Sequence, residues 1–243
     1  MTLTPNPSPR GRGEFPDSPL ETEAAIFPHI RLHGNRPPQP ADSENKIAMS
    51  ILVIVGHQRP GSFNHAIADA AIEELESLGH ETVFHDLYAE KFDPVLPHEE
   101  INPNAELDPV LRRHCDEVLA ADGIVIVHPN WWGMPPAVLK GWLDRVFRQG
   151  TIYSFTAAGV TSNLSGKRAL VLTTSNTPRD DELRLYGDPL ENLWKNCIFG
   201  FLGVTDFARR NFESIVLSTP EQRAAWLDDV RQLVRERFAG AKH

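Results

Sequence analysis

The sequence predicts a doubly wound α/β fold, in which helices cover both faces of five parallel β-strands in the order 2-1-3-4-5. Short continuous apolar runs, such as 51–55 and 123–127, are typical of strands buried on both faces. Amphipathic segments alternate with these runs, which predicts right-handed crossovers between parallel strands. An eight-unit barrel also suits a chain of 243 residues, but the sequence contains five strand–helix units.

Each predicted strand is a short run rich in apolar or β-branched residues. The segment 92–107 is too rich in proline and asparagine to be assigned. Strands are expected at 51–55, 82–86, 123–128, 168–174 and 204–212.

Each predicted helix carries an apolar stripe at helical spacing. Asn64 is expected to cap the first helix, and Gly79 to end it. Pro135 and Pro136 open the third helix, because proline suits a first turn. Helices are expected at 64–78, 109–121, 135–147, 190–201 and 220–238.

Composition excludes several classes of protein. With 24 Lys+Arg and 33 Asp+Glu the net charge is −9, which argues against a general nucleic-acid binder. No apolar run approaches the roughly 20 residues that span a bilayer, so no membrane insertion is expected. Two cysteines suit a reducing compartment, and we expect the protein in the cytoplasm.

The segment 1–48 differs from the rest of the chain, because it holds 9 of the 20 prolines and almost no apolar periodicity. We expect a disordered extension there and one domain over 49–243. A proline-rich ligand for a partner domain is the alternative. A third interpretation is that translation starts at Met49, directly before the first strand.

Three loops follow strands that end at the same edge of the predicted sheet, where doubly wound folds bind ligands. In the loop 56–64, Gly61 permits close backbone approach, and Ser62 and Asn64 stand at a helix N-terminus. Such an arrangement suits an anion such as phosphate. A purely structural turn, with Ser62 or Asn64 as helix cap, is the alternative.

The second loop, 128–136, contains Trp131 and Trp132 between stiffening prolines. Such an aromatic edge suits a flat ring system, with one tryptophan packed inward and the other facing the ligand. Core packing or dimer contacts are the alternative. The third loop, 173–178, offers hydroxyls and backbone amides to a polar edge. Together the three loops suit flavin mononucleotide.

Several motifs resemble the NAD(P)H:quinone oxidoreductases, a flavodoxin-like group that includes DT-diaphorase, modulator-of-drug-activity reductases and ancillary subunits of potassium efflux systems. The resemblance runs from about residue 51 to 238, and its most specific part is Trp-Gly-Met-Pro-Pro-Ala-Val-Leu-Lys-Gly-Trp within 129–147. Weaker matches are Ser-Phe-Asn at 62–64, Asp-Leu-Tyr at 86–88 and Phe-Asp-Pro at 92–94.

The resemblance implies a role for each matching position. The flavin phosphate and ribityl chain would be held by His57, Ser62, Phe63 and Asn64. The isoalloxazine ring would be flanked by Pro129, Asn130, Trp131 and Trp132, and its pyrimidine edge contacted by Thr174, Ser175 and Asn176. The substrate pocket, shared between the two subunits of a homodimer, would include Trp132, Tyr153 and Phe155.

Two departures from the family pattern affect the third loop. Many relatives carry two glycines where this chain has Ser175 and Asn176. The animal enzymes use a tyrosine and a histidine after this loop to buffer charge on the reduced flavin, whereas here Tyr186 stands alone. We assign Tyr186 the catalytic role of hydrogen-bond donor to the flavin, with a packed aromatic side chain as the alternative.

The resulting hypothesis is a flavoenzyme that carries out ping-pong transfer of a hydride from NAD(P)H, through FMN or FAD, to a quinone-like acceptor. A flavodoxin-like electron carrier is one alternative, although it has no need of the pocket formed by Tyr153 and Phe155. A regulatory ancillary subunit of a potassium efflux system is another.

The remaining polar residues are interpreted as structural. No histidine pair has metal-binding helical spacing backed by a third ligand, so no metal site is predicted. Solvated positions are expected for His80, His85, Arg209, Arg210 and the acidic run 180–182, and buried, inert thiols for Cys115 and Cys197.

Overall fold

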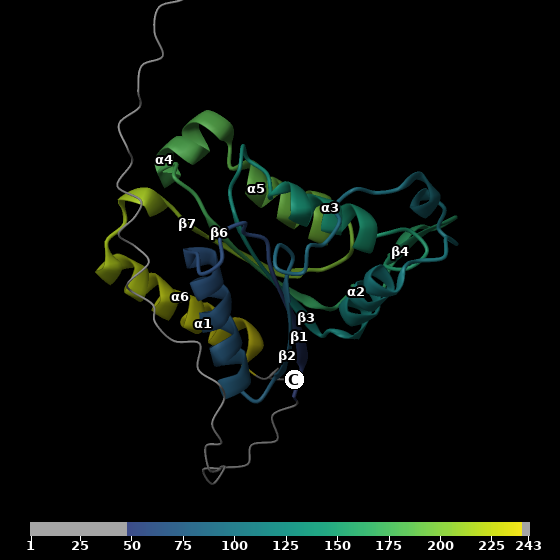
Figure 1. The fold of residues 1–243 in the computed structure, drawn as a ribbon, viewed down its shortest axis with the longest axis horizontal. Coiled ribbons are helices and arrows are strands. Elements are labelled where there is room, and N and C mark those ends of the chain that lie inside the picture. The colour runs from purple at the N-terminus through teal and green to yellow at the C-terminus, as the bar shows by residue number, and fades with distance from the viewer. Residues whose placement is uncertain (1–47, 240–243) are drawn as a thin grey trace, which may run out of the picture. The chain divides into compact units, whose positions relative to one another are not determined.

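The computed structural model describes residues 48–239, which form a five-stranded parallel sheet in the order β2-β1-β3-β6-β7 (Figure 1). This is the predicted order 2-1-3-4-5, and the fold prediction is confirmed. The expectations for the segment 1–48 fall, except for residue 48, outside the described residues. The strands of this sheet are β1 (Ser50–Val55), β2 (Glu81–Asp86), β3 (Gly123–Pro129), β6 (Arg168–Thr174) and β7 (Asp206–Phe212).

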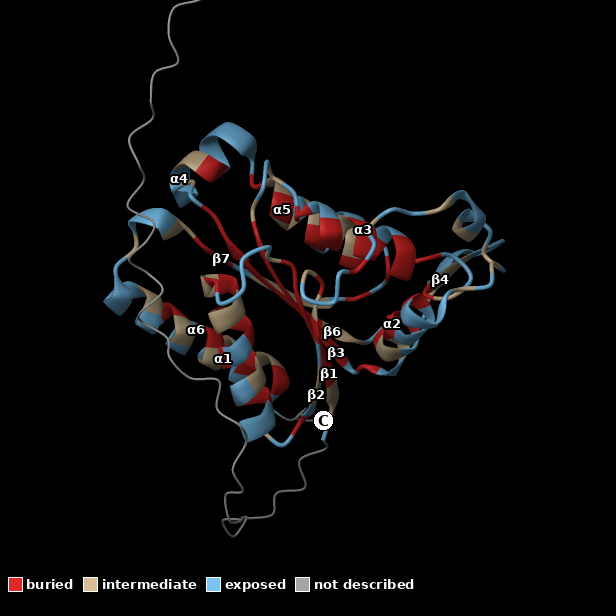
Figure 2. Ribbon diagram, viewed as in Figure 1, coloured by how far each residue is buried: buried red, intermediate tan, exposed pale blue. Residues whose placement is uncertain are grey.

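Helices cover both faces of the sheet, and buried residues line the faces between them (Figure 2). One face is covered by α1 (Phe63–Ser77) and α6 (Pro220–Phe238). The other is covered by α2 (Pro109–Ala120), α3 (Ala137–Val146), α5 (Pro189–Asn192) and the π-helix η4 (Leu193–Gly200). Successive residues of β1 enter the two cores alternately, which explains its continuous apolar run.

The first helix begins differently from the prediction. Ser62 is its N-cap, whereas Asn64 lies within the first turn and is buried. Leu78 is the C-cap, and Gly79 follows in the left-handed conformation with φ +85°. The expected helix 190–201 is a single turn of α5 continued by η4.

A second, two-stranded sheet was not predicted. It consists of β4 (Tyr153–Thr156) and β5 (Gly159–Ser162), which pair antiparallel between α3 and β6. Both strands are short, and most of their residues are exposed or half-buried, so they lack the apolar run that marks the main sheet. The segment 92–107 contains one short 3-10 helix, η2 (His98–Ile101).

Several side chains that we expected in solvent are buried. His80 lies between the backbone N–H of Met49 and the carbonyl oxygen of Phe238, at 3.2 and 2.7 Å. The side chains of His85 and Arg209 are 4% and 2% exposed. Cys115 is buried as predicted, but Cys197 is exposed. Within 48–239 no helix is long and apolar enough to cross a membrane.

Gly141 of α3 provides a test of the packing. A Cβ atom there would lie 2.2 Å from the carbonyl oxygen of Pro94. An exposed Gly→Ala change inside a helix stabilises by up to about 1 kcal/mol, but here we expect Gly141→Ala to destabilise by about 1–3 kcal/mol because the backbone must shift. Urea unfolding decides between these opposite signs. A stabilised variant would contradict the described packing.

Candidate functional site

Three loops at the carboxyl ends of β1, β3 and β6 are joined by hydrogen bonds. Gly56 N donates to the carbonyl oxygen of Val127 at 2.9 Å, and Asn130 N donates to that of Thr174 at 2.6 Å. Asn64 Nδ2 donates to Thr174 Oγ1 at 3.0 Å. The structure therefore brings together the first-, second- and third-loop residues that the sequence predicted as one site.

The first loop presents the N-terminus of α1. Gly61 has φ +65° and no atom within 4 Å of the position of a Cβ, so the space above it is open. Ser62 Oγ accepts the N–H of His65, while other first-turn N–H groups remain available to an anion. Phe63 does not face this space, because its ring packs on Phe212 and Trp226.

Two histidines lie close together beside this helix end, with ring centroids 6.2 Å apart. Burial, with the neighbouring His65 next in importance, lowers the pKa of His57. Sequence reasoning missed His65, whose Nδ1 lies 2.8 Å from Ser62 Oγ and whose Nε2 lies 3.0 Å from Asp86 Oδ2. This chain of contacts positions the Ser62 hydroxyl. The position of His65, three residues after Ser62 and therefore on the same side of the first helical turn, could have indicated this contact.

The second loop is a tight turn that displays both tryptophans. Trp131 and Met134 exchange two backbone hydrogen bonds of 3.0 Å. Trp132 and Gly133 between them have φ +57° and +72°. Trp131 is 42% exposed and Trp132 fully exposed, so the expectation that one of them packs inward is wrong. Pro189 of α5 supports the turn, since a Cβ on Gly133 would lie 2.7 Å from Pro189 Cγ.

Asn130 ties the second loop to a segment that follows the third. Its Oδ1 accepts the N–H of Gly133 at 2.9 Å, and its Nδ2 donates to Glu182 Oε1 at 3.2 Å. Glu182 is only 2% exposed, although the run 180–182 was expected to be loop charge. The Asn130 side chain therefore shapes the turn, while neighbouring Pro129 ends the buried strand β3.

The polar groups of the third loop mostly form hydrogen bonds within the protein. Ser175 N donates to the carbonyl oxygen of Phe212 at 2.9 Å, and Ser175 Oγ accepts from Asn211 Nδ2 at 2.9 Å. The amide of Ser175 is therefore not free, contrary to expectation. Asn176 is exposed, and its Oδ1 accepts the N–H of Val216 at 3.3 Å.

Tyr186 ends a π-helical segment, η3 (Glu182–Tyr186), that follows α4 (Arg179–Asp181), and it is 62% exposed. The segment is held at both ends, by the Glu182–Asn130 hydrogen bond and by Asp188. Arg209 Nη1 donates to both carboxylate oxygens of Asp188 at 2.9 Å. Burial raises the pKa of Asp188, but hydrogen bonds from Arg209 and Arg179 outweigh it, so the net shift is downward.

Tyr153 and Phe155 are not part of this edge within one chain. They lie on β4, on the opposite side of the molecule from α4 in Figure 1. Their rings meet edge to face with centroids 5.7 Å apart, and Tyr153 also contacts Phe201 at 5.3 Å. The predicted substrate pocket with Trp132 is therefore not formed by residues of one chain.

His128 lies buried beneath the second loop. Its Nδ1 donates to the carbonyl oxygen of Pro129 at 2.8 Å, and its Nε2 accepts the Trp194 indole N–H at 3.0 Å. Burial lowers the pKa of His128 from its usual 6.5 to about 4. The imidazole is therefore neutral at neutral pH.

This buried imidazole predicts a loss of stability in acid. Between pH 6.5 and 4 the unfolded state takes up a proton at His128 that the folded state does not, so the contribution of His128 to the free energy of unfolding falls by about 3 kcal/mol as the pH drops. Below pH 4 this contribution changes no further. We expect His128→Gln to flatten this slope in urea titrations, while the exposed His98→Asn keeps it. An unchanged slope in His128→Gln would refute the assignment.

Comparison with known proteins gives consistent results. The profile of the family described as flavodoxin-like fold matches residues 49–237. An uncharacterized NAD(P)H oxidoreductase of Haemophilus influenzae is 31% identical over 185 residues, covering 74% of this chain and 91% of that protein. NAD(P)H dehydrogenase [quinone] 1 of Cavia porcellus is 30% identical over 164 residues, which cover 59% of this chain and only 60% of that enzyme.

Two solved structures are similar as well. Smu.1420 of Streptococcus mutans is 31% identical with a TM-score of 0.70, covering 77% of this chain and all of that one. The NAD(P)H:quinone oxidoreductase of Methanothermobacter marburgensis has a TM-score of 0.69 at 23% identity, covering 78% of this chain and 97% of that one, which shows a shared fold.

Proposed function

Because this chain belongs to the flavodoxin-like fold family, we propose that it is a flavin-dependent oxidoreductase that passes two electrons from NAD(P)H to a quinone-like acceptor. The observation that carries the proposal is the meeting of an open helix N-terminus, an exposed tryptophan pair and polar side chains at one sheet edge. The name of the Haemophilus influenzae relative supports an NAD(P)H oxidoreductase, and that of the Cavia porcellus relative supports a quinone as acceptor.

The residues present fit a flavin with a terminal phosphate. The open space above Gly61, together with the first-turn N–H groups and the Ser62 hydroxyl, suits the phosphate. Trp131 and Trp132 offer apolar surface to a planar ring. When bound, the flavin supplies the hydride-accepting and hydride-donating chemistry.

The residues of the chain would bind the flavin and orient its ring. The reciprocal hydrogen bonds of Trp131 and Met134 hold the aromatic turn rigid, which reduces the entropy lost when a ring is bound. Tyr186 offers a phenolic hydroxyl as donor from a segment fixed through Glu182 and Asp188. Burial lowers the pKa of His57, which disfavours its charged form, and His128 is neutral at neutral pH.

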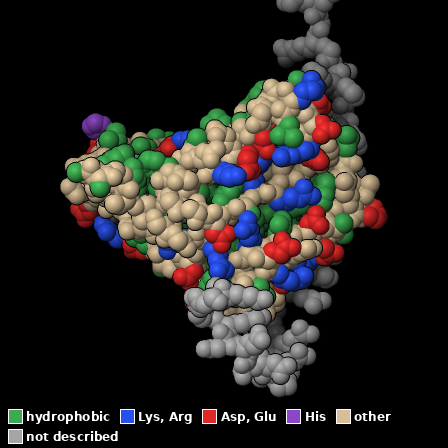
Figure 3. Space-filling model, turned by 180° about the vertical axis from the view of Figure 1, so that it is seen from behind, with side chains coloured by type: hydrophobic (Ala, Val, Ile, Leu, Met, Phe, Trp, Pro, Cys, Tyr) green, Lys and Arg blue, Asp and Glu red, His purple; other side chains and the backbone are tan. Residues whose placement is uncertain are grey.

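We further propose a cytoplasmic homodimer, in which the β4–β5 hairpin of one protomer completes the pocket of its partner. Phe155 and Val160 of the hairpin are 61% and 39% exposed, and Trp132 is fully exposed. Viewed from behind, hydrophobic side chains gather toward the end that lies at the right in Figure 1, while charges mix over the other half (Figure 3). Mixing equal amounts of inactive Trp132→Ala and Phe155→Ala proteins should restore about a quarter of the wild-type activity if the pocket is shared, because half of the dimers are then mixed and each has one intact pocket.

The absorption spectrum of the purified protein, followed by stopped-flow mixing with NADPH or NADH, tests the reaction. We expect a flavin spectrum that bleaches on mixing and recovers on addition of a benzoquinone. A protein that binds no added FMN or FAD would end the proposal. A flavin that bleaches only with a partner reductase would favour the electron carrier.

A further inference from the structure

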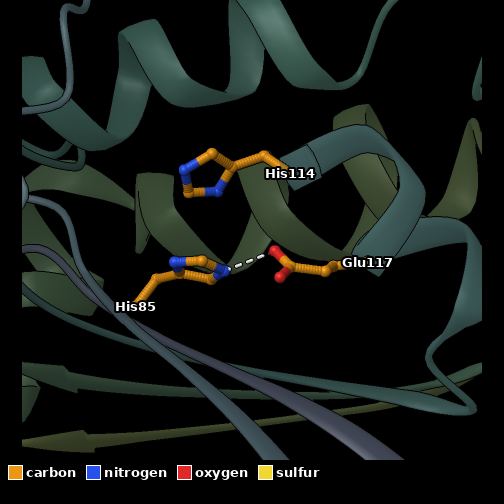
Figure 4. A group of neighbouring side chains, drawn as sticks. All are labelled: His85, His114 and Glu117. Carbon is orange, nitrogen blue, oxygen red and sulfur yellow. Dashed lines mark hydrogen bonds and ion pairs between the residues drawn. The ribbon is translucent and has the colours of Figure 1, made fainter. Parts of the chain in front are cut away.

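A group of metal-ligating side chains lies between β2 and α2, apart from the three loops. His85 of β2 points toward His114 and Glu117 of α2, which share one helix face (Figure 4). One ligand atom from each of the three lies within 4.8 Å of the others. Glu117 Oε2 is 2.6 Å from His85 Nε2, and the two imidazole rings are 4.1 Å apart.

The hydrogen bonding of His114 is incomplete. Its side chain is 1% exposed, and its Nε2 has no hydrogen-bond partner among the described residues. Its Nδ1 accepts a long hydrogen bond, 3.3 Å, from the Trp142 indole N–H. The proton of the neutral ring is therefore on Nε2, and the lone pair is on Nδ1.

A second carboxylate stands behind both rings. Glu90 Oε1 is 2.8 Å from His85 Nδ1, and Glu90 Oε2 is 3.5 Å from His114 Nε2. Glu90 is therefore in hydrogen-bond contact with His85 Nδ1, and a small shift of its second oxygen would let it accept the N–H of His114 Nε2 when His114 Nδ1 binds a metal ion. This is the usual arrangement of carboxylates behind metal-bound histidines, which fixes their tautomers and orientation.

We propose that His85 Nε2, His114 Nδ1 and the Glu117 carboxylate bind a divalent metal ion of the zinc class, with Glu90 as the outer carboxylate. Two imidazoles and one carboxylate form a known zinc ligand set. Tetrahedral zinc ligands lie roughly 3.4 Å apart, so rotation of the partly exposed Glu117 and a small shift of His114 close the site. The ion joins the edge strand β2 to α2, and the inference does not rest on the proposed function.

Zinc titration of the full-length protein by calorimetry tests the site. We expect one Zn²⁺ per chain, with binding lost in His85→Asn and in Glu117→Gln. Glu90→Gln should weaken binding about 10- to 100-fold, as outer carboxylates do. His98→Asn, which removes an exposed histidine on η2, is the matched control and should bind like the wild type. Unchanged binding in His85→Asn, or none in the wild type, overturns the proposal.

A substitution of Trp142 distinguishes zinc binding at this site from adventitious binding at the surface. The Trp142 N–H competes with the metal for the lone pair of His114, so we expect Trp142→Phe to tighten zinc binding about fivefold. Affinity that is unaffected by Trp142→Phe contradicts ligation through Nδ1. Thermal melts provide a check on folding. Zn²⁺ should raise the Tm of the wild type but not that of Glu117→Gln, in which the glutamine side chain keeps the shape of glutamate but lacks its charge. A Tm rise that persists in Glu117→Gln counts against the site.

Discussion

We expect Ser62→Asp to weaken flavin binding by about a hundredfold or more while leaving the fold intact. Ser62 is the N-cap of α1, and aspartate caps helices as well as serine does. Its carboxylate, however, would stand where we propose the flavin phosphate, and like charges placed together cost several kcal/mol. Fluorescence titration with FMN measures the affinity, and urea unfolding measures the stability.

Ser62→Ala is the matched control. It removes the cap hydroxyl and should lower stability by about 1 kcal/mol, while it weakens FMN binding far less than Ser62→Asp does. The two variants therefore rank in opposite order for stability and for affinity. If both lower affinity equally, charge is not the cause and the anion site is elsewhere.

Asp188→Asn should have the largest effect on stability, a loss of about 3–5 kcal/mol. Arg209 and Asp188 are 2% and 4% exposed, and the guanidinium donates to both carboxylate oxygens. Asparagine keeps the shape of the side chain and caps α5 as aspartate does. The loss therefore comes from leaving the buried Arg209 charge without its nearest counterion, with only Glu191 at 3.5 Å remaining. Urea unfolding of the purified protein measures it.

The exposed pair of Arg184 and Asp181 supplies the comparison. Its nitrogen and oxygen lie 2.6 Å apart, closer than the 2.9 Å of the buried pair, but the two side chains are 66% and 45% exposed. Asp181→Asn should therefore change stability by less than about 1 kcal/mol. A similar loss in both variants would show that burial does not set the strength of the Asp188 pair.

The sheet and the meeting of the three loops that form the candidate site were predictable because both follow from local patterns. The run 51–55 fits strand β1 closely, since a strand covered on both faces is apolar at every position. Once the strands are parallel, the loops after β1, β3 and β6 must meet at one edge. The Asn64–Thr174 hydrogen bond, across 110 positions of the sequence, is a consequence of that topology.

The buried polar pairs were not predictable, because their partners come from distant segments. The sequence alone predicts a solvated charge at Arg209, because only the folded structure shows its contact with Asp188. In the same way, His85 and His114 have no helical spacing, and only the packing of α2 on β2 brings them together. The β4–β5 hairpin was not predicted, because Phe155 and its neighbours are exposed and form no continuous apolar run.

The packing of α6 on α1 has a consequence for synthesis on the ribosome. Arg235 of α6 binds Glu74 of α1 at 2.7 Å, and a Cβ on Gly123 of β3 would lie 2.6 Å from the Phe238 ring. The helix α6 thus follows all five strands of the main sheet in the sequence, although it covers part of the sheet face that begins with β1. We expect nascent chains that stop before α6 to expose one apolar sheet face and to be held by chaperones, and full-length chains to be released.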